Sequence, residues 1–166
     1  MTGWLWPEQV FALIAQAGKI DTEFRLLLIA CTWCGLRLSE ALGLACDDVR
    51  LAEAFAWLRD TKNGEPQPVH LPPPSWSPSS LIIRAGSKRP GERVFRFAKG
   101  GHVYSLLRVA AFRAEITLPR RQAFHLLRHT YATSKTPYHR HFLTLAASPP
   151  TTHSSRLAPL PMEGGS

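Results

Sequence analysis

The chain has 166 residues, 45% of them hydrophobic, which is enough for one domain with a core and too few for two domains of ordinary size. Its formal net charge is +8, and residues 1–60 hold five basic and eight acidic side chains, whereas residues 61–166 hold fifteen and four. Such a basic region favours a polyanionic partner, most often nucleic acid. No cationic leader is visible, and the longest apolar run is too short to span a bilayer, so we expect a cytoplasmic protein with no membrane partner.

The N-terminal part of the chain predicts helices. A first helix begins at Pro7, which suits a first turn, and Gly18 is expected to end it. Asp21 or Thr22 can cap a second helix that contains the long apolar run. A short helix follows over Leu38–Leu44. Together these patterns indicate a mainly helical N-terminal half.

The middle of the chain predicts a small antiparallel element. Residues 54–60 alternate in the manner of a strand, Asn63-Gly64 is a strong hairpin signal, and residues 69–71 can return as the partner strand. A proline-rich stretch over residues 72–78 excludes a regular helix there. Residues 91–97 are expected to form a short strand or an extended loop.

Two further helices are expected over residues 104–114 and 124–133, separated by a basic loop. Residues 134–166 are rich in Pro, Ser and Thr and lack an apolar period, which predicts a disordered tail. The fold class is therefore α+β, mostly α, with one ordered domain over residues 1–133. Cys31, Cys34 and Cys46 supply too few ligands for structural zinc, so we expect buried core cysteines and no metal.

Three segments together resemble the catalytic domain of the tyrosine recombinase (phage integrase) family. Residues 34–42, CGLRLSEAL, resemble the family's T-G-L-R-x-S-E-L motif, and residues 60–71 resemble its T-K-containing β-hairpin. Residues 124–133, FHLLRHTYAT, resemble H-x-L-R-H-T-[FY]-A, the most specific signature. The resemblance extends from about Leu5 to Thr133. It implies the fold of that domain, with a small antiparallel sheet, and an activity in site-specific DNA recombination and integration.

The resemblance assigns catalytic roles to Arg37, Lys62, His125 and Arg128. It implies metal-independent cleavage and rejoining of double-stranded DNA through a 3′-phosphotyrosine, with no cofactor. Arginines suit this role, because planar guanidinium groups stay protonated and can donate hydrogen bonds to the phosphodiester oxygens on which negative charge develops. A histidine suits proton transfer near neutral pH, and His125 and Arg128 are three residues apart, so on a helix they share one face.

Simpler interpretations exist for each of these residues. Arg37 could form an ordinary ion pair with Glu40 within one helix, and Lys62 could be a solvated turn lysine. Tyr104 and Tyr131 lie in helical segments and are expected at the core or its margin. Further basic residues are candidates for contacts with the DNA backbone; these are Lys88, Arg89, Arg93, Arg96, Arg120 and Arg121.

The family pattern breaks down after Thr133. The family has a G-[HW] motif about two dozen residues beyond its second arginine, and its nucleophilic tyrosine about nine residues later. Here His153 is a weak match to that histidine, and the position nine residues on is Met162. Tyr138 is the last tyrosine and a weak candidate nucleophile, because it follows Arg128 too closely. The change at residue 134 indicates a frameshifted or truncated gene product.

Three functional interpretations follow from this mismatch. The chain could be a catalytic-domain remnant that binds DNA without cleaving it, alone or beside other recombinase protomers. It could be an active strand transferase that uses Tyr138 or a tyrosine supplied by another protomer. It could instead be a non-enzymatic regulatory or protein-interaction domain on the same fold. The composition and the motifs favour the first interpretation.

Overall fold

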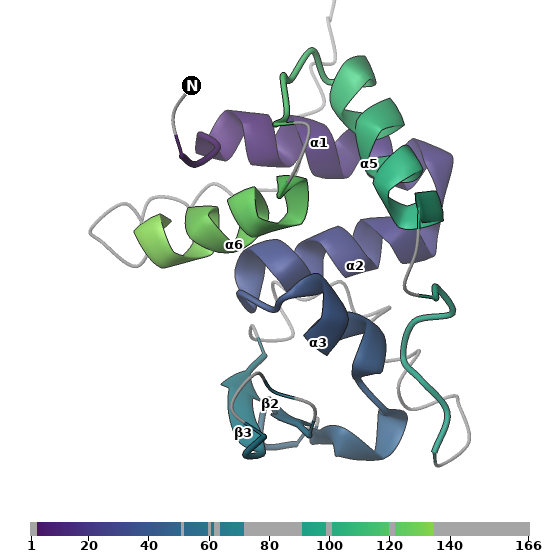
Figure 1. Cartoon of the computed structure of the whole chain (residues 1–166), viewed down its shortest axis with the longest axis vertical. Coiled ribbons are helices and arrows are strands. Elements are labelled where there is room, and N and C mark those ends of the chain that lie inside the picture. Colours follow the sequence, from purple (N-terminus) through teal and green to yellow (C-terminus); the bar gives the residue numbers. More distant parts are fainter. Residues whose placement is uncertain are drawn as a thin grey trace, which may run out of the picture.

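The structure is a computed structural model that describes residues 3–50, 52–59, 61, 64–71, 91–98, 101–119 and 122–134. Within them the chain forms helices and a small antiparallel sheet, which lies at one end of the helical part (Figure 1). In chain order the elements are α1 (Pro7–Ile20), α2 (Thr22–Trp33), α3 (Leu38–Gly43), a 3-10 turn η1 (Cys46–Asp48), β1 (Val49–Arg50), β2 (Phe55–Leu58), β3 (Gln67–His70), α5 (Gly101–Arg113) and α6 (Ala123–Ser134).

The first two helices follow directly from the local sequence. Pro7 occupies the first turn of α1, and the Asp21 carboxylate caps α2 by accepting a hydrogen bond of 2.8 Å from the backbone N–H of Phe24. The expectation that Gly18 ends α1 is wrong, because α1 continues to Ile20. Gly18 instead gives room to a neighbour, since a Cβ there would lie 2.9 Å from Cδ of Arg25.

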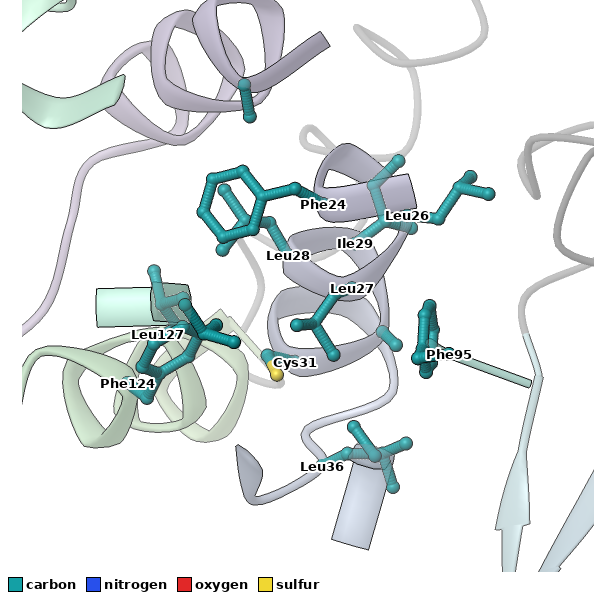
Figure 2. Close-up of a cluster of buried hydrophobic side chains, with 14 of the residues drawn as sticks. Phe24, Leu26, Leu27, Leu28, Ile29, Cys31, Leu36, Phe95, Phe124 and Leu127 are labelled. Carbon is teal, nitrogen blue, oxygen red and sulfur yellow. The ribbon is translucent and has the colours of Figure 1, made fainter. Parts of the chain in front are cut away.

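Helix α2 runs through the centre of the core. It is buried along most of its length, and this explains why its sequence is apolar on nearly every face. Figure 2 shows its side chains, such as Leu27 and Cys31, lying between Phe124 and Leu127 of α6 on one side and Phe95 on the other. Helix α1 packs against both α2 and α5. The core therefore joins segments that are about a hundred residues apart.

The predicted hairpin is confirmed and gains a third strand. Strand β2 pairs antiparallel with β3 in the register Ala56 with Val69 and Trp57 with Pro68, and β1 pairs with the other edge of β2. Ala56 and Leu58 face the core, whereas Trp57 is exposed. The alternation in the sequence thus places the strand correctly.

An extended segment over residues 91–98 ties the sheet end to the helices. Its backbone bonds twice to the turn after α3, through Val94 N–H to Leu44 and Cys46 N–H to Glu92, both at 2.9 Å. Further along, Arg96 pairs with Asp21 and with Glu23, whose side chain is almost fully buried. This segment has extended geometry and one bridge to Ala45, so the expectation of a short strand or extended loop is confirmed.

Candidate functional site

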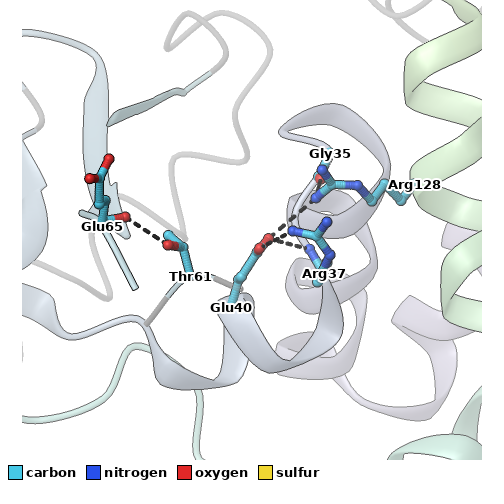
Figure 3. Close-up of polar contacts among 6 residues, drawn as sticks. All are labelled: Gly35, Arg37, Glu40, Thr61, Glu65 and Arg128. Carbon is cyan, nitrogen blue, oxygen red and sulfur yellow. Dashed lines mark hydrogen bonds and ion pairs between the residues drawn. The ribbon is translucent and has the colours of Figure 1, made fainter. Parts of the chain in front are cut away.

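The turn between α2 and α3 places the first arginine. Gly35 has φ +66°, a left-handed conformation that residues with a Cβ adopt at a cost. The ring of Tyr131 lies against it so closely that a Cβ at Gly35 would be 2.3 Å from Cδ1 of the tyrosine. This contact brings α6 up against the turn. Arg37 then stands at the start of α3, and Arg128 faces it from α6 (Figure 3).

One buried carboxylate holds both arginines. Glu40 Oε1 accepts from Arg37 Nη1 at 2.6 Å, and Oε2 accepts from Arg128 Nη1 at 3.3 Å and from the Arg37 backbone N–H at 2.8 Å. Arg128 Nη1 also donates to the carbonyl oxygen of Gly35 at 2.9 Å. The ordinary helix ion pair between Arg37 and Glu40 is therefore present, but it belongs to a cluster in which Glu40 also pairs with Arg128, 88 residues further along the sequence.

The cluster holds more positive than negative charge. Two guanidinium groups meet one carboxylate, and the side chain of Glu40 is 4% exposed, whereas those of Arg37 and Arg128 are 36% and 38% exposed. The buried carboxylate orients both guanidinium groups, and the two arginine side chains remain partly exposed to solvent. Such a pair of oriented arginines can bind the oxygens of an anion.

A pocket of about 350 Å³ opens beside the arginines. Its wall includes His125, one turn before Arg128 on α6, and Tyr104 of α5. The remaining lining comes from α3 and from the start of α6, namely Leu38, Ser39, Leu42 and Phe124. The structure thus brings Arg37, His125 and Arg128 to a single pocket, as the motifs predict.

Tyr104 lies at the margin of the core, one of the two places expected for it. It is 43% exposed, and its ring stands edge-on to the buried ring of Phe124, with centroids 5.2 Å apart at 89°. The helical period alone did not distinguish a core position from a pocket wall. The position is decided by Phe124, which arrives from α6.

Solved structures of known proteins resemble this chain in fold. The structure matches the catalytic domain of bacteriophage HP1 integrase with a TM-score of 0.60 and 27% identity, over 78% of this chain and 69% of that one. The chain has the fold of a tyrosine recombinase catalytic domain. XerA recombinase matches with a TM-score of 0.61 and 23% identity, over 81% of this chain and 51% of that one. No model of a protein family matches the sequence, and neither does any curated protein.

The hairpin between β2 and β3 is the segment that resembles the lysine-bearing hairpin of the recombinases. The structure describes the residues on either side of the expected lysine. Gly64 has φ +74°, and its N–H donates to the carbonyl of Thr61 at 3.0 Å. Figure 3 shows the second bond of this turn, in which Thr61 Oγ1 donates to the carbonyl of Glu65 at 2.6 Å. Lys62 itself lies outside the described residues. Its catalytic role stays a prediction from the recombinase resemblance.

Other residues suggested by the sequence also lie outside the described part of the chain. The candidate nucleophile Tyr138 and the weak match His153 are among them. So are four of the proposed DNA contacts, Lys88, Arg89, Arg120 and Arg121. Of the remaining two, Arg96 pairs with Asp21 and Glu23 and lies over the ring of Phe97 at 5.2 Å, which gives it a structural task.

The three cysteines are buried and free, as expected. Burial raises the pKa of the Cys34 thiol to about 12, and burial together with the charges of Cys34 and Glu40 raises that of Cys31 as well. Both thiols are therefore protonated and unreactive near neutral pH. In the described ranges no group of three or more metal-binding side chains gathers, and no helix is long and apolar enough to cross a membrane.

Proposed function

We propose that this recombinase-fold chain binds double-stranded DNA by a backbone phosphate in the pocket of Arg37, His125 and Arg128, and does not cleave it. One observation carries the proposal: buried Glu40 holds two half-exposed guanidinium groups side by side at a pocket that also contains His125. Guanidinium groups oriented in this way can donate hydrogen bonds to the oxygens of a phosphodiester. The basic balance of residues 61–166 supports a polyanionic partner.

The chemistry of this site is that of transesterification at phosphorus. In the recombinase reaction a tyrosine attacks the phosphorus, a 3′-phosphotyrosine bond forms, and the 5′ oxygen leaves with a proton. Arg37 and Arg128 would stabilise the charge on the non-bridging oxygens, His125 would exchange a proton, and Lys62 would protonate the leaving oxygen. The sequence has no tyrosine after Tyr138, so the attacking group lacks its family position.

Binding without cleavage follows from that mismatch. Placing the nucleophile in line with the leaving oxygen supplies a large part of the rate enhancement, and phosphate binding needs no nucleophile. We therefore expect DNA affinity and strand cleavage to be separable in this chain. An interaction domain without DNA affinity is the competing interpretation.

Fluorescence anisotropy with a labelled DNA duplex tests the binding step. Arg128→Ala should weaken binding about tenfold or more, since a charged hydrogen-bonded contact is lost. Arg113→Ala is the matched control, because Arg113 is exposed on α5, lines neither pocket and carries the same charge. Its effect should stay within about threefold. Equal effects of the two substitutions, or affinity that does not fall with added salt, would contradict the proposal.

Cleavage is tested with nicked suicide substrates and denaturing electrophoresis. We expect no covalent protein–DNA adduct from this chain, whereas an active integrase on its own site provides the positive control. An adduct that disappears in Tyr138→Phe would show that Tyr138 is the nucleophile and that the proposed inactivity is wrong.

A further inference from the structure

A second, larger pocket adjoins the arginine pocket. It has a volume of about 560 Å³, within the roughly 300–1,000 Å³ that is typical of ligand sites. It is lined by side chains of α5, among them Tyr104, Arg108 and Phe112, by Ile116 and Leu118 from the segment after α5, and by Ala123 at the start of α6. We call it the α5 groove. Tyr104 lines both pockets and so forms the wall that they share.

The α5 groove combines an apolar floor with an exposed aromatic ring and a cation. Phe112 is 84% exposed, an unusual position for a large apolar side chain, and Arg108 also lines the groove. Exposed aromatic rings beside arginines are the features by which proteins hold unpaired nucleobases, because every base has a flat π-face and its backbone is anionic.

Because Tyr104 lines both pockets, the two pockets lie next to each other. The ring of Tyr104 packs edge-on against Phe124. A ligand that occupies both pockets therefore needs an anionic group next to a flat, largely apolar group. A nucleotide has this arrangement, with its phosphate adjoining its sugar and base.

We propose that, where the bound DNA strand is not base-paired, the α5 groove binds a nucleobase of the strand whose phosphate lies against Arg37 and Arg128. This inference rests on the proposed phosphate-binding function and adds the ligand class for the neighbouring pocket. The base would stack on Phe112 or Tyr104 at the groove, with Arg108 close to the backbone. The chain should therefore prefer single strands that carry bases to abasic single strands.

The experiment compares two single-stranded probes of equal length, oligo(dT) and an abasic deoxyribose-phosphate oligomer. The chain should bind oligo(dT) about fivefold or more tightly than the abasic probe, in line with the contribution of base stacking. Phe112→Ala should reduce this preference and leave abasic binding unchanged, because Phe112 lines only the groove. Phe112→Trp should retain the preference. Val109→Ala is the control, since Val109 is exposed on the same helix but lines neither pocket.

The outcomes separate this inference from the function on which it rests. Equal binding of both probes, each weakened by Arg128→Ala, would overturn the base site and leave phosphate binding intact. Failure of both probes and of duplex DNA to bind would overturn both. If Val109→Ala also lost the preference for oligo(dT), the base site would be overturned. The base site would likewise be overturned if Phe112→Ala kept the preference but changed self-association in ultracentrifugation, because the groove would then be a protein-docking surface.

Discussion

Among the described residues, two clusters of arginine and buried carboxylate join distant segments of the chain, and they differ in how many carboxylates and guanidinium groups meet. At the Glu23 cluster, the guanidinium of Arg96 meets two carboxylates, those of Asp21 and Glu23. At the Glu40 cluster, two guanidiniums, those of Arg37 and Arg128, meet one carboxylate. Both clusters join segments that are more than seventy residues apart.

The difference separates a structural contact from a binding site. Arg96 directs Nη2 and Nε at carboxylates and its guanidinium lies over the ring of Phe97, so the Glu23 cluster fastens residues 91–98 to the start of α2. The Glu40 cluster keeps a surplus positive charge and opens on a pocket with His125. An excess of oriented donors over buried acceptors therefore marks the place where an external anion can complete the pairing.

The largest expected effect comes from the turn that supports the Glu40 cluster. Gly35→Ala should lower the free energy of unfolding by roughly 2–6 kcal/mol, because it adds strain at φ +66° and a clash with the Tyr131 ring. Denaturant unfolding measures this. In Gly35→Ala/Tyr131→Ala the clash is absent and the strain remains, so a cycle with the single variants should show coupling. Strict additivity would contradict the described contact.

The next effect distinguishes the clusters by their response to a ligand. Short duplex DNA at about a hundred times its Kd should stabilise the protein by about 2.7 kcal/mol if only the folded state binds. Arg96→Met should retain this stabilisation, whereas Arg128→Met should lose most of it. Tm measured with and without DNA gives the comparison. Loss in both variants would mean that the Glu23 cluster also contributes to binding.

The same two substitutions should differ in the opposite sense without a ligand. Arg96→Met removes the guanidinium that pairs with buried Glu23 and with Asp21, and should cost about 1–2 kcal/mol of unfolding free energy. Arg128→Met leaves Glu40 paired with Arg37 and should cost less than about 1 kcal/mol. Chemical denaturation near neutral pH measures both. A larger cost for Arg128→Met would mean that the Glu40 cluster is chiefly structural.

The smallest effect concerns a thiol packed near the Glu40 cluster. The pKa of Cys34 is about 12 in the folded chain and about 8.5 in an unfolded one, so its contribution is present below pH 8.5 and is lost as pH rises toward 12. Between pH 7.5 and 9 the loss is about 0.8 kcal/mol. The decline in unfolding free energy over this interval should be smaller in Cys34→Ala. An identical decline would show that Cys34 titrates normally when folded.

Sequence by itself determined most of the elements and the three pocket residues of the motifs. The apolar run gives α2 because a central helix must be buried on nearly every face, and the spacing of His125 and Arg128 puts them on one face of α6. Asn63-Gly64 predicts the hairpin, because a tight turn needs residues that tolerate positive φ, as Gly64 does. These are local rules, and they hold wherever neighbours in sequence decide the conformation.

Only the tertiary structure decided how the site is assembled. Glu40 pairs with Arg37 by a local spacing, yet its second partner is Arg128, 88 residues away, and no local period encodes that contact. Gly18 stays within α1, and Tyr104 becomes a pocket wall because Phe124 stands beside it. Helical periodicity tells which residues share a face but not what that face meets, because packing between distant segments decides which side chains are covered and which remain open to a ligand.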